Sequence, residues 1–229
     1  TILLPSLAKT YADQDVSGYS KLLDWGLRMT VMLAVPAAAA LALLAVPLIV
    51  TLFYHGAFTV HDVDMTRQAL LAYSVGLVGL ILVKILAPGF YARQNVTTPV
   101  RIAVLTLIGT QLLNLVLVGP LAHAGLALSI GLAACFNAAL LYWKLRAHAI
   151  YQPQPGWLAF SLKVALAVIV MGGVLYLLNR PSTWWTTVGT LERVLWLSGL
   201  VIAGAASYFA ALFALGFRFR DFRRADPSS

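Results

Sequence analysis

The residues KILAPGFYARQNVTTPVR, from Lys84 to Arg101, lie between two long apolar segments. They contain a lysine within hydrophobic sequence, a break at Pro88-Gly89, and a short loop that begins with Arg93. A proline followed by a glycine tends to end a helix. The stretch therefore indicates a basic turn between two membrane-spanning helices.

The composition excludes an ordinary soluble domain. The chain is 61% hydrophobic and 10% charged, whereas soluble domains carry about 25% charged residues. Its apolar runs reach the roughly 20 residues that span the hydrocarbon core of a bilayer. The net charge of +8 does not indicate a nucleic-acid partner, because the basic residues lie at the ends of apolar runs and not on one face of a soluble module. We expect an integral membrane protein of the all-α class.

Six segments are long and apolar enough to form complete transmembrane helices of a polytopic bundle, at 29–54, 67–91, 100–121, 124–143, 157–178 and 191–216. They fall into four helices over 29–147, two helices over 148–216 and a basic tail over 217–229. Residues 1–28 are expected to hold the end of a preceding helix and a connector. Within it, Tyr19–Leu27 forms either an amphipathic helix on the membrane surface or a solvated segment. Because the chain starts abruptly at Thr1, without methionine, we expect the C-terminal part of a longer protein.

Alternate polar segments differ sharply in their basic residues. One set holds twelve, namely Lys9, Lys21, Arg28, Arg93, Arg101, Lys144, Arg146, Lys163, Arg218, Arg220, Arg223 and Arg224. The other set holds three, namely Arg67, Arg180 and Arg193. The positive-inside rule then places both ends of this segment in the cytoplasm, with Arg93, Arg101, Lys144 and Arg146 as orientation-setting residues of the turns.

Lys84 is the only ionisable residue well inside an expected span. A charge at the bilayer centre costs about 2.5–3.5 kcal/mol on insertion scales, so its position needs a reason. One interpretation is that the ammonium faces a water-filled cavity and meets an anionic substrate. The other is that the side chain snorkels to the interface, roughly 10 Å away at Tyr91.

Small and polar residues recur at intervals of four on three spans. Stripes of this kind allow close packing of membrane helices, and the candidate packing residues are Gly125, Ser129 and Ala133 on the fourth span and Gly199, Ala203 and Ser207 on the sixth. Gln111, Asn114 and Asn137 lie in the third and fourth spans and are either packing residues or, with Lys84, substrate-binding residues facing a polar cavity.

The polar loop His55–Thr66 carries two histidines and two aspartates but no HxxxH or HExxH spacing, which favours a solvated loop over a metal site. All eight acidic residues are expected in loops or tails. The sequence also lacks a nucleophile elbow and a phosphate-binding P-loop. We therefore expect no catalytic residues, no metal and no cofactor.

Several motifs in order along the whole chain resemble the MurJ (MviN) family of lipid II flippases, within the multidrug/oligosaccharidyl-lipid/polysaccharide exporter superfamily. They are LLPSLAK at 3–9, DWGLR at 24–28, AYSVGL at 72–77, Lys84 with LAPGFY at 86–91, TPV at 98–100, GPL at 119–121, HAGL at 123–126 and PQPGW at 153–157. The resemblance is to the proteobacterial members. It implies a protein of fourteen helices in two lobes, of which this chain supplies the ninth to fourteenth.

The resemblance also implies a function in peptidoglycan and cell wall biogenesis, and hence in cell shape, in the bacterial inner membrane. Such a protein moves lipid II, an undecaprenyl-diphosphate-linked disaccharide-pentapeptide, to the outer leaflet by alternating access, as a transporter and not an enzyme. The implied partners are lipid II, membrane lipids and the N-terminal lobe, and the spans 157–178 and 191–216 would form a groove for the lipid tail. The head-group arginines of the family lie mainly outside this sequence.

Two alternatives remain open from the sequence. One is a flippase or exporter of another polyprenyl-linked glycan or of a drug in the same superfamily. The other is a membrane-embedded glycosyltransferase or acyltransferase, for which only the His55–Asp64 loop offers candidate residues.

Overall fold

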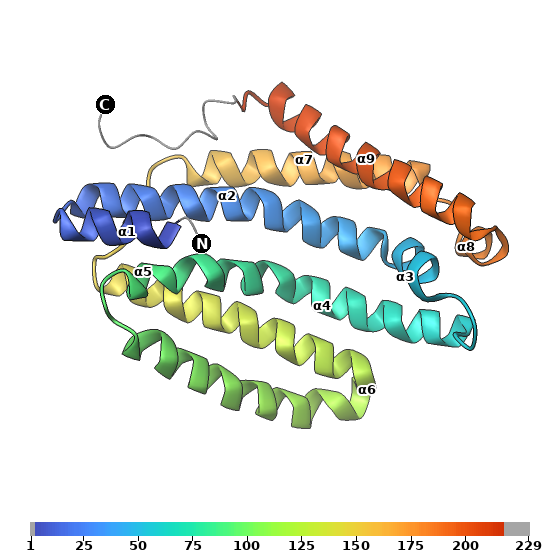
Figure 1. The fold of residues 1–229 in the computed structure, drawn as a ribbon, viewed down its shortest axis with the longest axis horizontal. Coiled ribbons are helices and arrows are strands. Elements are labelled where there is room, and N and C mark those ends of the chain that lie inside the picture. The colour runs from blue at the N-terminus through green and yellow to red at the C-terminus, as the bar shows by residue number, and fades with distance from the viewer. Residues whose placement is uncertain (1–2, 218–229) are drawn as a thin grey trace.

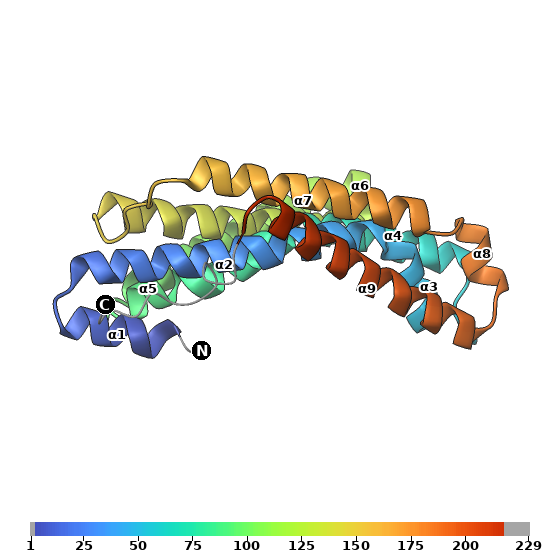
Figure 2. The same cartoon turned by 90° about the horizontal axis from the view of Figure 1, so that it is seen from above.

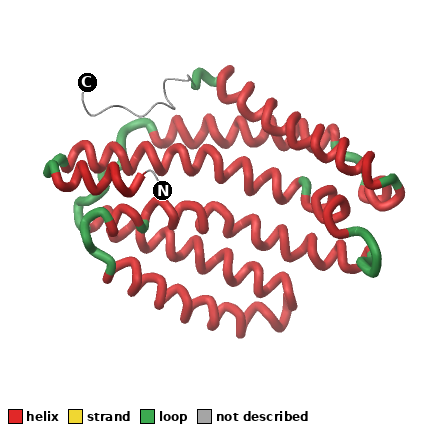
Figure 3. The backbone as a smooth tube through the Cα atoms, in the orientation of Figure 1, coloured by secondary structure: helices red, strands yellow, loops and turns green. Residues whose placement is uncertain are grey.

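The computed structural model describes residues 3–217, and these fold into α-helices without a strand (Figure 3). The helices are α1 (Leu3–Ala12), α2 (Val16–Leu43), α3 (Ala45–Phe53), α4 (Val60–Leu86), α5 (Pro88–Tyr91), α6 (Thr97–Ala147), α7 (Trp157–Leu178), α8 (Ser182–Thr187) and α9 (Thr190–Ala214). The basic tail expected at 217–229 lies, apart from Phe217, outside the described residues.

Five helices of this part of the chain, namely α2, α4 with α5, α6, α7 and α9, are long and apolar enough to cross a membrane. The all-α membrane bundle is thus confirmed, whereas the count of six complete spans stays a prediction. The difference comes from α6, which runs through both the third and the fourth expected spans. Its 51 residues bend at Ala122, where φ is 47°, two residues after Pro120. Figure 1 shows the helix folding back on itself at this point.

The first span begins much earlier than expected. Helix α2 starts at Val16, and the carboxylate of Asp15 accepts the Gly18 N–H to cap it. The segment Tyr19–Leu27 is therefore the first part of this helix, which differs from both alternatives expected for it, a surface helix and a solvated segment. Helix α2 ends at Leu43 because Pro47, four residues later, has no N–H to donate to that carbonyl. The chain then resumes as α3.

The His55–Thr66 segment is a loop only as far as Thr59. Thr59 and Asp62 form a capping box in which each side chain bonds the other residue's backbone N–H, and α4 starts at Val60. His61, Asp62 and Asp64 thus belong to the first turns of a helix, and Asp62 has a structural use there.

The stretch from Lys84 to Arg101 forms the expected turn between two long helices. Helix α4 ends at Leu86, just before Pro88, which has no N–H for the carbonyl of Lys84. One helical turn, α5, follows, and α6 begins at Thr97 after a short loop in which Gln94 has a φ of 57°.

The helices form an extended array in the order α6, α4, α2, α7 and α9, each packing mainly on the next (Figure 1). Helix α9 also contacts α3, and in both views it crosses α7 obliquely (Figure 2). The α7–α9 pair therefore meets the other helices chiefly through α2 and α3. We call the end of the array that holds α5, the end of α6 and the start of α7 the basic end, because Arg93, Arg101, Lys144 and Arg146 belong to it.

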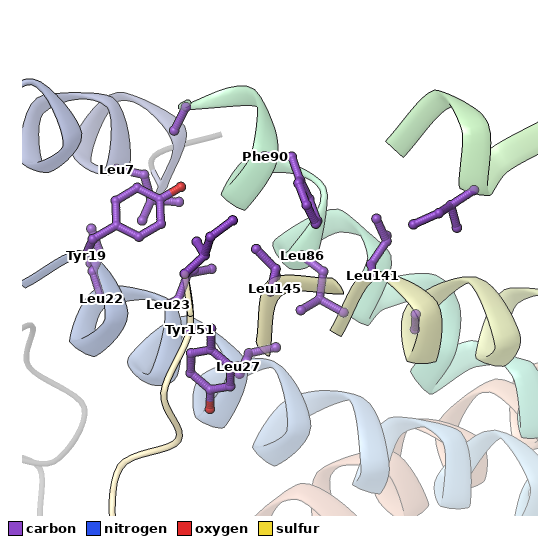
Figure 4. Close-up of a cluster of buried hydrophobic side chains, with 14 residues drawn as sticks. Leu7, Tyr19, Leu22, Leu23, Leu27, Leu86, Phe90, Leu141, Leu145 and Tyr151 are labelled. Atoms are coloured by element: carbon purple, nitrogen blue, oxygen red, sulfur yellow. The ribbon is translucent and has the colours of Figure 1, made fainter. Parts of the chain in front are cut away.

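A buried cluster holds the basic end together. Figure 4 shows leucines of α1, α2, α4 and α6 converging around Phe90 of α5 and Tyr151 of the α6–α7 linker. The hydroxyl of Tyr19 on α2 donates a hydrogen bond to the carbonyl of Gly89. The Pro88-Gly89 break is thus fixed within the core of this end.

The bend at Ala122 divides α6 into a first arm before it and a second arm after it. The closest helix contact joins α4 to the second arm. A Cβ built on Gly76 would lie 2.0 Å from the Cα of Gly131, and one on Gly79 would lie 2.6 Å from the backbone nitrogen of Cys135. Gly125, Ser129 and Ala133 are buried on the same arm, and Gly125 meets the backbone of Leu117 on the first arm. The two arms and α4 therefore approach backbone to backbone, as small residues permit in membranes.

On α9 the contact line differs from the expected stripe. Gly199 is exposed and faces open space, and Ala203 and Ser207 are only half-buried. The buried line is instead Arg193, Leu200, Gly204, Tyr208 and Leu212, one position further round, where Gly204 packs on Leu175 of α7. A helix rich in small residues has several faces on which another helix could pack. On α9 the buried face is the one where Leu200, Tyr208 and Leu212 accompany Gly204.

Candidate functional site

Two of the polar residues expected to face a cavity lie on one face of α6 and line an open hollow. Gln111 and Asn114, on the first arm of α6, line a hollow of about 410 Å³ together with Leu115, Val118 and Gly119. The side-chain oxygen of Asn114 is buried and has no hydrogen-bond partner within the described residues. An unsatisfied buried acceptor of this kind costs about 1–3 kcal/mol, so a donor from elsewhere would stabilise it. Asn137 is half-buried on the second arm and does not line this hollow.

Lys84 lies in the last turn of α4, near the basic end and not at the middle of the helix. Its side chain is exposed, and neither of the two ion pairs among the described residues involves it. The helix dipole favours a cation at this position. Within the membrane-length segment Val60–Tyr91, Lys84 therefore lies seven residues from the end, as the sequence predicted.

A polar clamp that was not expected from the sequence joins α2 to the α6–α7 linker. Asp24 of α2 is 2% exposed, and its Oδ1 accepts hydrogen bonds from the Tyr151 hydroxyl at 2.6 Å and the Trp157 indole N–H at 2.7 Å. The backbone N–H of Gln154 donates to the same oxygen at 3.1 Å. Oδ2 accepts from Nε of Arg28 at 2.7 Å, so both carboxylate oxygens are hydrogen-bonded.

The clamp continues on both sides of Asp24. Nη2 of Arg28 donates to the carbonyls of Gln154 and Pro155, and its guanidinium lies 5.2 Å from the Trp157 ring. One turn earlier, the Ser20 hydroxyl exchanges hydrogen bonds with the backbone of Gln152. Burial, and then the hydrogen bond to the Asp24 carboxylate, raise the pKa of Tyr151 well above its ordinary value. Tyr151 therefore stays a neutral donor at any physiological pH.

A second polar tie lies at the opposite end of the same helix pair. Arg193, in the first turn of α9, is 8% exposed and donates to the carbonyls of Tyr54 and Thr186, each at 3.3 Å. Its guanidinium also lies 5.4 Å from the Tyr54 ring. The α7–α9 pair is thus fastened to α2 at the basic end and to the end of α3 at the other.

The burial of Asp24 corrects the expectation for the acidic residues, and one feature of the sequence did indicate the clamp. Asp24 is buried in a helix, so the acidic residues are not all in loops or tails. The signal was an acid and a base four residues apart, Asp24 and Arg28, beside a tryptophan in otherwise apolar sequence. Its partner segment, PQPGW at 153–157, lies more than a hundred residues away, and no spacing rule joins the two.

Five apolar membrane-length helices with buried polar ties between them define a multi-pass membrane helix bundle. Residues 1–218 match the family model of the lipid II flippase MurJ. The chain belongs to the MurJ family.

Individual relatives agree. The chain is 48% identical over 225 residues to the lipid II flippase MurJ of Burkholderia cenocepacia, with 98% of this chain and 44% of the relative covered. It is 38% identical over 226 residues to the probable lipid II flippase MurJ of Vibrio cholerae, with 98% and 43% covered. The chain thus spans less than half the length of these relatives.

A solved structure supports the fold. The lipid II flippase MurJ in an inward closed conformation superposes with a TM-score of 0.76, at 21% identity, over 98% of this chain and 44% of that one. The resemblance of the motifs and the all-α bundle are therefore confirmed.

Proposed function

We propose that this chain is the C-terminal part of a lipid II flippase, which moves the undecaprenyl-diphosphate-linked peptidoglycan precursor from the inner to the outer leaflet of the bacterial cytoplasmic membrane by alternating access. The observation that carries the proposal is the match of residues 1–218 to the family model, together with 48% identity to a relative of that name. The protein acts as a transporter and not as an enzyme. It works with the preceding half that its relatives contain.

The physical task fits the surfaces of this part of the protein. A flippase must shield a diphosphate and sugars from hydrocarbon while the polyprenyl tail remains in lipid. The α7–α9 pair, which we propose as the wall of a tail groove, exposes large apolar side chains such as Leu166, Ile169 and Ile202. The excess of lysine and arginine at the basic end supports a cytoplasmic location for it.

Conditional depletion of the full-length protein in its own bacterium tests the function. Lipid II translocation, followed by the appearance of labelled precursor in the outer leaflet, is expected to stop on depletion and to return with the wild-type protein. Unchanged translocation would contradict the proposal. Accumulation of a different polyprenyl-linked glycan, or retention of a drug, would instead support the alternative transporters of the superfamily.

We further propose that the exposed ammonium of Lys84, with Gln111, Asn114 and Asn137 as polar wall residues, contacts the anionic part of the substrate. Lys84→Gln is expected to reduce translocation about tenfold or more, because a hydrogen bond to a charged group is worth roughly 1.5–3 kcal/mol. Lys84→Arg keeps the charge and should retain most activity. Lys21→Gln, an exposed lysine of α2, is the matched control. If both Lys84 variants translocate lipid II as fast as the wild type, the side chain does not contact the substrate and only extends to the membrane interface.

A further inference from the structure

A basic and aromatic hollow lies where α2, the first turns of α7 and the end of α9 meet. It measures about 370 Å³ and is lined by two cations, Arg28 and Lys163, and three aromatic residues, Trp25, Phe160 and Phe217. No carboxylate is among its lining residues in the part of the chain that the structure describes. The hollow is separate from Lys84 and from the cavity beside Asn114.

Aromatic contacts fix the two cations of the hollow. The rings of Phe160 and Phe217 meet edge to face with centroids 5.8 Å apart. The guanidinium of Arg28 lies 5.7 Å from the Phe160 centroid, and the ammonium of Lys163 lies 5.5 Å from the Phe217 centroid. The cations therefore flank one aromatic pair, and the interaction with the ring faces holds each of them in place.

The hollow offers charge and hydrogen-bond donors that this part of the protein does not use. Lys163 is half-buried and takes part in neither of the ion pairs found in residues 3–217. Arg28 spends Nε and Nη2 on the clamp, which leaves Nη1. The indole N–H of Trp25 is buried and unpartnered among the described residues. Buried donors normally find a partner, so a ligand with several acceptor oxygens fits here.

We propose that this hollow binds the phosphate of an anionic glycerophospholipid from the membrane leaflet at the basic end. A phosphate accepts hydrogen bonds from several donors at once, and Lys163 and Arg28 supply the charge. A lipid fits better than a free anion because α7, which supplies Phe160 and Lys163 to the hollow, also carries Leu162 and Leu166, which are at least half exposed. Interfacial aromatic and basic side chains commonly hold such head groups.

Lipid-dependent thermal stability of the full-length protein in neutral detergent tests this site without any transport readout, so it stands apart from the flippase proposal. Phosphatidylglycerol is expected to raise the melting temperature, and phosphatidylcholine and inorganic phosphate at equal concentration are not. Lys163→Gln should raise the concentration of phosphatidylglycerol needed for half the shift about fivefold. Lys144→Gln is the matched control, since Lys144 lies over an aromatic ring at the same end but does not line the hollow.

The outcomes separate the sources of the phosphate. Equal phosphatidylglycerol dependence in the wild type and in Lys163→Gln, or an equal loss in Lys144→Gln, would overturn the site. Stabilisation by inorganic phosphate alone would show a free-anion site instead of a lipid site. Native mass spectrometry of the same samples should show phosphatidylglycerol bound to the wild type and depleted in Lys163→Gln. Exclusive retention of a polyprenyl diphosphate there would make the hollow part of the substrate path and contradict the proposal.

Discussion

Asp24→Ala is expected to lower the stability of the protein more than any surface change. The substitution leaves the Arg28 guanidinium without its counter-ion and removes the acceptor of three further donors, from Tyr151, Gln154 and Trp157. Removing one partner of a buried ion pair costs about 3–5 kcal/mol. The melting temperature of the purified full-length protein measures the loss. The α6–α7 linker should also become accessible to protease, because the clamp holds it against α2.

Two variants make this expectation specific. Asp24→Asn keeps a side-chain acceptor but loses the charge, so it should fall between the wild type and Asp24→Ala. Asp13→Ala removes an exposed carboxylate near the start of the same helix and should be close to neutral. Equal melting temperatures for Asp24→Ala and Asp13→Ala would show that the clamp contributes nothing to stability.

Gly76→Ala should separate α4 from the second arm of α6. The new Cβ would stand 2.0 Å from the Cα of Gly131, and backbone atoms cannot turn aside as side chains do. Overpacking of this kind typically costs about 1–3 kcal/mol and sometimes more. Replacing glycine by alanine normally stabilises a helix by roughly 1 kcal/mol. A large loss of stability in Gly76→Ala would therefore come from the contact between α4 and α6 and not from helix propensity.

Gly109→Ala on the first arm of α6 is the matched control, because a Cβ there meets nothing within 4 Å. This variant should be neutral or slightly more stable than the wild type. The rate of disulfide formation between cysteines placed on α4 and on the second arm of α6 measures how far apart the two helices are, and it should fall in Gly76→Ala. Gly76→Ala and Gly109→Ala with the same melting temperature would mean that the two helices do not approach as closely as the structure shows.

Much of this architecture could be predicted from the sequence, because a bilayer imposes length and apolarity on every span. Helices α7 and α9 begin and end within a few residues of their expected ranges. The predicted start of the first span, at residue 29, was wrong, because α2 begins at Val16. This early part of α2 depends on burial of Asp24 and Leu23 against distant segments and not on hydropathy. The prediction failed again along α9, where Leu175 of another helix selects Gly204 and not Gly199 as the point of contact.

The polar residues were harder to predict for a related reason. The single charge within an apolar run, at Lys84, was conspicuous in the sequence, yet it lies exposed in the last turn of α4. The most heavily bonded charge is Asp24, which looked like an ordinary connector residue. Sequence patterning reports where a helix crosses the membrane. Which polar groups meet depends on contacts between segments more than a hundred residues apart.

The two polar ties of the α7–α9 pair restrict how this part of the protein changes shape. One tie holds Trp157 to α2, and the other holds Arg193 to the carbonyl of Tyr54 at the end of α3. Because the pair is tied at both ends, we expect α2, α3, α7 and α9 to move together as one block. We then expect any flexing of this part of the chain at the boundaries of that block, and the outward apolar flank of the pair would move together with α2.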